Sequence, residues 1–98
     1  MPRTHITIGG TSIHDILNTT VNSTSWTPIT VPIDTKCHSI LAGLRAGTSW
    51  KLSHLATGAR YKTIKGELSF DISMRMLDTL FYAQLASGAD VLEVILLN

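Results

Sequence analysis

The adjacent residues Cys37 and His38 are the pair whose side chains could support nucleophilic catalysis. A catalytic cysteine needs a base such as histidine within hydrogen-bond reach of its thiol. Residues 37–46 alternate in the manner of a β-strand, and neighbouring residues of a strand point to opposite faces. The sequence therefore favours a buried, inert cysteine. Because Cys37 is the only cysteine, it also excludes an internal disulfide.

The residues that could bind a metal ion or act in acid–base catalysis form no recognisable pattern either. The chain holds four histidines, His5, His14, His38 and His54. They lie far apart and match no zinc-ligand spacing. Asp71 and Asp78 flank a predicted turn, while Glu67 and Glu93 stand alone, so no carboxylate pair is indicated. The sequence thus predicts no catalytic residue, no metal site and no cofactor.

Three aromatic residues, Trp26, Trp50 and Tyr61, are the remaining candidates for a binding site. Together they could form a platform for carbohydrate. Scattered aromatic residues more often anchor a core or a protein interface, because they bury a large area with few rotatable bonds. We therefore take all three as interface candidates and keep the carbohydrate platform as the alternative.

Charge and hydropathy limit the possible partners. The net charge is +1, only 15% of residues are charged, and Lys and Arg do not cluster, so no specific nucleic-acid binding is expected. No apolar run is long enough to span a bilayer, which argues against a membrane partner. The first ten residues lack the apolar segment of a signal peptide, so synthesis in a cytoplasm is expected.

Short runs of alternating apolar and polar residues, separated by turn residues, dominate the chain. They predict strands over residues 4–8, 26–33, 37–46, 49–55, 60–64 and 68–72. In the fourth of these, Trp50 and Leu52 are expected to face inward, with Lys51 and Ser53 facing outward. Two prolines place residues 26–33 at a sheet edge. Residues 11–25 are polar and are expected to form a loop with at most one turn of helix.

The stretch 73–87 allows two interpretations. It could be a helix with Ser73 as N-cap and Gly88 just past its end. Alternatively, a turn at 73–78 precedes a strand at 79–86, and residues 87–90 then turn the chain into the last strand, forming a hairpin. The strand is favoured, because every other segment of the chain is typical of β-structure.

The last strand, residues 91–97, is unusually apolar for the end of a chain. Alternation places Leu92, Val94 and Leu96 in the core, which suits a strand in the middle of a sheet. The interface candidates Val91, Ile95 and Leu97 point the other way. An apolar outer face suggests cover by a neighbouring subunit, so a homo-oligomer, a trimer or a dimer, is expected.

These elements predict an all-β protein with a single β-sandwich domain, jelly-roll-like, over residues 26–98. Residues 1–25 are expected to form an extended N-terminal arm and loop. Ile6 and Ile8 lie on one face of the arm and are interface candidates, because such an arm could add a strand to the sheet of a neighbour.

From Trp26 onward the chain resembles small virion proteins of tailed bacteriophages. The similar segments are "WTPITVP", "CHSILAGLRAG", "SWKLS", "YKTIKGELSFDI" and "DTLFYAQLASGADVLEVILL". The fourth looks like two strands joined by a glycine turn, and the fifth like a terminal hairpin.

The resemblance implies a structural β-sandwich protein of the virion, a capsid cement or decoration subunit that catalyses nothing. Its expected partners are further copies of itself and the major capsid protein or another virion protein. A phage neck or tail component is one alternative, and a module that binds a host-surface glycan receptor is another.

Overall fold

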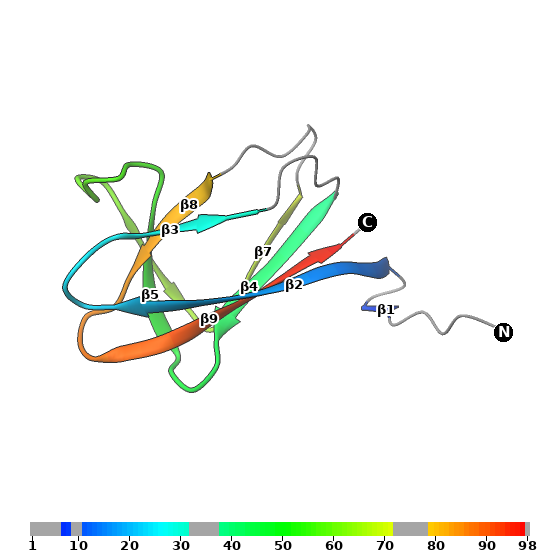
Figure 1. Cartoon of the computed structure of the whole chain (residues 1–98), viewed down its shortest axis with the longest axis horizontal. Helices are drawn as coiled ribbons and strands as arrows, with labels where there is room; N and C mark the ends of the chain where they lie inside the picture. The colour runs from blue at the N-terminus through cyan, green and yellow to red at the C-terminus, as the bar shows by residue number, and fades with distance from the viewer. Residues whose placement is uncertain (1–6, 9–10, 32–37, 72–78, 98) are drawn as a thin grey trace, which may run out of the picture.

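The computed structural model describes residues 7–8, 11–31, 38–71 and 79–97. These residues form nine strands and two sheets (Figure 1). The strands are β1 (Thr7–Ile8), β2 (Thr11–Asn22), β3 (Thr27–Thr30), β4 (Ser39–Leu44), β5 (Ser49–Ser53), β6 (Lys62–Lys65), β7 (Leu68–Asp71), β8 (Thr79–Gln84) and β9 (Ala89–Leu97). One sheet has the order β1-β2-β9-β4-β7, and the other has the order β3-β8-β5-β6.

Strands β2 to β9 pair in a nested manner. The first pairs with the last (β2 with β9), the second with the second last (β3 with β8), then β4 with β7 and β5 with β6, all antiparallel. A chain folded back on itself in this way and then rolled into two sheets is a jelly roll. The prediction of an all-β, jelly-roll-like sandwich is therefore confirmed.

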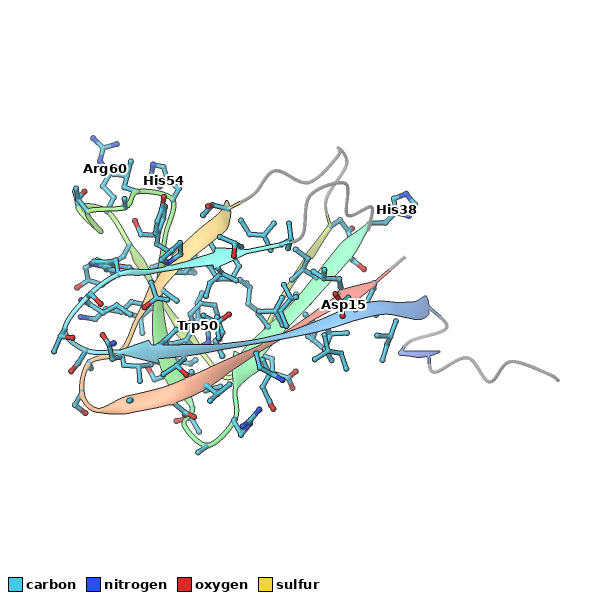
Figure 2. The ribbon with its side chains drawn as sticks, viewed as in Figure 1. Asp15, His38, Trp50, His54 and Arg60 are labelled. Atoms are coloured by element: carbon cyan, nitrogen blue, oxygen red, sulfur yellow. The ribbon has the colours of Figure 1, made fainter. Side chains whose placement is uncertain are left out.

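The core lies between the two sheets and follows from the alternation of apolar residues. Its fully or almost fully buried members are Val21, Ile29, Val31, Ile40, Ala42, Trp50, Ile64, Phe81, Ala83, Leu85, Leu92, Val94 and Leu96. Trp50 is the largest of them and lies between the layers (Figure 2). Burying each large aliphatic side chain contributes roughly 1.5–3 kcal/mol, so this layer supplies most of the driving force for folding.

The apolar run at the end of the chain forms a central strand. β9 is paired with β2 on one side and with β4 on the other. Leu92, Val94 and Leu96 have no exposed surface, as predicted. The run at the end of the chain is apolar because one face of the strand fills the core. Both edges of the strand are already hydrogen-bonded to neighbouring strands.

The expectation that residues 11–25 form a loop is wrong. β2 covers Thr11–Asn22 and pairs along its length with β9. The polar residues that suggested a loop lie mainly on the solvent face, while Leu17 and Val21 face the core. A register shift between Ile13 and Asp15 interrupts the alternation, and this irregularity concealed the strand.

The ambiguous stretch after Ser73 contains a strand, as favoured, but the predicted hairpin is wrong. Phe81, Ala83 and Leu85 share one face and are buried. However, β8 and β9 belong to opposite sheets, so the turn between them carries the chain across the sandwich. At this corner Gly88 has a positive φ of 71°, and its carbonyl accepts a hydrogen bond from the Ser23 amide at 3.1 Å. The predicted turn at residues 73–78 lies outside the described residues.

Two smaller expectations have different outcomes. β3 lies at the edge of its sheet, as the prolines predicted. Ser53 was expected to face solvent, yet it is only 1% exposed. Its hydroxyl donates to the Arg60 carbonyl at 2.6 Å and accepts from the Leu55 amide at 3.0 Å. The segment after β5 folds back over Ser53, and these two bonds offset the cost of burying the hydroxyl.

Asp90, at the start of β9, fixes the turn between β4 and β5. Its carboxylate accepts hydrogen bonds from the amides of Gly47 and Val91, both at 2.7 Å, and a longer one from Ala46. The hydrogen bonds from Val91 and Gly47 lower the pKa of the Asp90 carboxyl below its ordinary value of 3.8, and Arg45 adds a smaller electrostatic contribution.

Replacing Asp90 with asparagine should lower the Tm at pH 7. A carboxyl whose pKa is lower in the folded state stabilises the fold above its unfolded pKa of about 3.8, and this contribution disappears as pH falls through the folded pKa. The Tm difference between Asp90→Asn and the unmodified protein should therefore shrink below pH 4. Thermal melts from pH 7 to pH 2 test this, with the exposed Asp71→Asn as control. A difference that does not depend on pH would contradict it.

Candidate functional site

Two surfaces on opposite layers of the sandwich carry the exposed apolar and aromatic residues. The first is the solvent face of the β2-β9-β4-β7 sheet. Ile16 of β2 and Leu41 of β4 both pair with Ile95 of β9, so the three side chains form one line across three strands. We call Ile16, Ile95 and Leu41 the outer apolar row. Ile16 is 51% exposed, and the other two are half-buried.

The surroundings of the outer apolar row give it a polar rim. Ile95 and Leu41 help to line a shallow pocket of about 250 Å³, which Glu67 and Glu93 also border. Glu93 accepts from Nε of Arg45 at 2.9 Å, and both side chains remain about half exposed. Such an exposed ion pair contributes little to stability. An apolar centre with a charged edge is typical of a protein-binding surface.

The three interface candidates of β9 share this face, but their exposure differs. Ile95 and Val91 are half-buried, whereas Leu97 is only 8% exposed. Leu97 pairs with Ile13 and Ser39, and its carbonyl accepts from the His38 amide at 2.8 Å. Ile95 is thus the member of the predicted set that lies at the centre of the accessible apolar surface.

The second surface lies on the β3-β8-β5-β6 sheet and brings Trp26 and Tyr61 together. Their ring centroids are 5.8 Å apart, with the planes tilted by 46°. Nζ of Lys51 lies 5.0 Å from the centroid of the Tyr61 ring, a cation–π contact. Tyr61 is 53% exposed and Trp26 is half-buried. We call Trp26, Tyr61 and Lys51 the aromatic cluster.

Turns position the aromatic cluster. The Asn22 side-chain carbonyl accepts hydrogen bonds from the amides of Thr24 and Ser25, both at 3.1 Å, which fixes the corner that leads to Trp26. Tyr61 follows a loop that Ser53 anchors. Gly58, in that loop, has a positive φ of 67°, and a Cβ there would overlap the indole of Trp26.

Three basic residues line a pocket next to Tyr61. A shallow pocket of about 240 Å³ is lined by Leu52, Ser53, His54, Arg60, Tyr61 and Lys62. Figure 2 shows His54 and Arg60 projecting from the same end of the sandwich. Among the described residues, no acidic one lines this pocket. The surface is therefore suited to a ligand that carries negative charge.

The remaining predicted interface residues do not join these surfaces. Trp50 is only 1% exposed and packs against Phe81 with centroids 5.8 Å apart, so it belongs to the core. Ile8 lies in β1 and pairs with Thr11. Ile6 and Cys37 lie outside the described residues, so the Cys37–His38 pair is not described together. His38 is exposed.

Sequence reasoning missed two members of the outer apolar row. Ile16 lies in the stretch that was expected to be a loop, and Leu41 was assigned to neither face of its strand. A signal was present for β2, because Leu17, Thr19 and Val21 alternate correctly once the irregularity at residues 13–15 is allowed. Leu41 could have been paired with Ile95 only if the register of β4 against β9 had been known.

Replacing Gly58 with alanine should separate the rings of the aromatic cluster. Alanine at a positive φ costs about 1 kcal/mol, and here its Cβ also overlaps Trp26. Gly88→Ala is the matched control, since Gly88 has a φ of 71° and nothing within 4 Å of the added carbon. Both variants should lose stability, but only Gly58→Ala should change the near-UV circular dichroism of the tryptophans. Equal spectra would show that Gly58 does not hold Trp26 in place.

Neither the chemistry of the described side chains nor the comparison with known proteins assigns a function to the chain. Within the described ranges, no group of three or more His, Cys, Asp or Glu side chains could hold a metal ion. Nor do these ranges contain a helix long and apolar enough to cross a membrane. The chain matches no protein-family model, no curated protein and no solved structure.

Proposed function

We propose that the chain is a structural protein of a bacteriophage virion, where it stabilises the capsid as a cement or decoration subunit. The observation that carries the proposal is the outer apolar row, which crosses the centre of one sheet and leaves Ile16 51% exposed. Apolar residues aligned on the outside of a sandwich are best accounted for by a protein partner.

The fold supports the same proposal by analogy. Jelly rolls build many viral capsid proteins, although lectins and other proteins also use them. The assignment to a phage rests on the resemblance of residues 26–97 to small virion proteins. A neck or tail component would use the same fold and the same apolar face, and differs only in its place on the particle.

In the mechanism we propose, the capsid is stabilised by many modest contacts that act together. Copies of the chain associate with one another and with capsid subunits, so that each oligomer straddles a joint of the shell. Opening a joint then also breaks the contacts of the oligomer, and many modest interfaces act together. Residues 1–10, which precede β2, are our candidate for a strand that joins a neighbouring sheet.

Heating of particles tests this function. Particles from which the protein has been stripped should release DNA at a lower temperature than complete particles, and re-adding the protein should restore the difference. Particles with a chain that lacks residues 1–10 should fall between these limits. Deleting residues 1–20 would be a poor test, because it removes most of β2. Equal release temperatures for bare and complete particles would contradict the cement function.

One observation favours a second candidate, the module that binds a host-surface glycan. Tyr61 keeps 53% of its surface exposed beside Trp26, whereas a protein with a purely structural role has no need to display this ring. The two functions use opposite layers of the sandwich, so they do not exclude each other.

A further inference from the structure

The aromatic cluster differs chemically from the rest of the described surface. It combines two aromatic rings in contact, an ammonium group over one of them, and a pocket with further cationic groups. Lys51 pairs with Gln84 on one side and with Thr63 on the other, so an amide and a hydroxyl lie in the adjacent register positions. Aromatic surface with a few polar groups on rigid strands is the usual composition of a small-ligand site.

We propose that the aromatic cluster and its pocket bind an acidic carbohydrate, a saccharide that carries a carboxylate. This inference deepens the second candidate function and does not rest on the capsid function. The exposed ring of Tyr61 would pack against the apolar face of a sugar ring. Arg60, which lines the pocket beside Tyr61, would bind the carboxylate, and Gln84 and Lys51 are the polar groups on the Tyr61 side of the sheet for sugar hydroxyls.

The charge of the pocket argues for a carboxylate rather than a neutral sugar. Arg60, Lys62 and His54 line it, and no acidic residue in the described part of the chain does so. A guanidinium group holds a carboxylate with two parallel hydrogen bonds, which adds both strength and geometric selectivity. The two glutamates that border a pocket, Glu67 and Glu93, do so on the other sheet face.

The same features argue against a nucleic acid as the ligand. Binding of a single strand requires a positively charged groove that follows several phosphates and a series of rings on which bases stack. Here one ring is mostly exposed, the second is half-buried and tilted by 46°, and the chain has a net charge of only +1. The shallow pocket of about 240 Å³ borders only one of the two rings.

The two tryptophans provide a direct readout. Each indole N–H gives its own signal in a ¹H–¹⁵N spectrum, and the chain holds only Trp26 and Trp50. Trp50 is buried, and its Nε1 lies 3.4 Å from the Gly66 carbonyl, so its signal serves as an internal control. Titration with tetragalacturonate and with an alginate tetrasaccharide should shift the Trp26 signal and leave the Trp50 signal in place.

Variants locate the site. Tyr61→Ala and Arg60→Gln should each weaken binding at least tenfold, and Gly58→Ala should weaken it by displacing Trp26. Gly88→Ala, which carries the same backbone strain elsewhere, should bind as the unmodified protein does. The carboxyl-reduced forms of both saccharides should bind at least tenfold more weakly.

Three results would overturn the proposal: no saturable shift with either acidic saccharide, equal binding of the neutral forms, or unchanged binding by Tyr61→Ala. Tighter binding of a single-stranded oligonucleotide would replace it with nucleic-acid recognition. The titration uses the isolated protein, so its outcome is independent of the particle-heating experiment.

Discussion

The variant Val94→Lys is expected to yield no folded protein, whereas Ile95→Lys, one residue further along the same strand, should fold. Val94 has no exposed surface and faces the core between the sheets. An ammonium group there loses its hydration without a partner, at a cost of several kcal/mol. The larger side chain adds about 1–3 kcal/mol of overpacking. Together these costs approach or exceed the 5–15 kcal/mol that holds a typical small domain together.

Ile95 provides the matched control because it carries the same change on the opposite face. Its side chain borders a pocket with Glu67 and Glu93, so a lysine would remain hydrated beside two carboxylates. Circular dichroism and thermal melts of the two variants compare them directly. A cooperative melt for Val94→Lys close to that of Ile95→Lys would contradict the assignment of β9 as the central strand of the core.

The second large effect is expected in self-association. We predict a homo-oligomer whose interface contains the outer apolar row, with weak dependence on salt because few charges take part. Ile95→Lys would place an ammonium group at the centre of that interface and should weaken association at least a hundredfold. Residues at the centre of an interface commonly contribute 2 kcal/mol or more, and removing the ammonium group from water adds to the loss.

Thr30→Lys is the control for this prediction. It adds the same charge at an exposed position of β3, on the other sheet. Sedimentation should show an oligomer for the unmodified protein and for Thr30→Lys, and a monomer for Ile95→Lys. A stable monomer of the unmodified protein at high micromolar concentration would contradict the prediction, as would an unchanged oligomer of Ile95→Lys.

The alternation of residues along the strand was enough to predict the buried face of β9. In β9 the alternation placed Leu92, Val94 and Leu96 in the core, and all three have no exposed surface. The strand β2 was not predicted, because an irregularity between Ile13 and Asp15 breaks the alternation and because its solvent face is rich in Thr and Asn. Local composition is a weak guide to a strand in which most polar residues lie on one side.

Pairing of strands could not be obtained from local pattern at all. Consecutive strands pair or neighbour one another about two-thirds of the time, so a hairpin of the last two strands was the natural expectation. In the jelly roll the last strand instead pairs with β2 and β4, through contacts distant in sequence.

The aromatic cluster also depends on contacts between residues that are distant in sequence. Trp26 and Tyr61 are separated by 35 positions and meet only because two loops converge. Gly58 permits that contact, and a glycine gives no signal of what it will approach.

The most direct test of the proposed virion function is an electron cryo-microscopy reconstruction of phage particles assembled with this protein. We predict density for the sandwich on the capsid shell, in symmetric oligomers, with Ile16, Ile95 and Leu41 against a neighbouring copy or a capsid subunit. Density only on a host-attachment structure, with the β2-β9-β4-β7 face open to solvent, would contradict the claim.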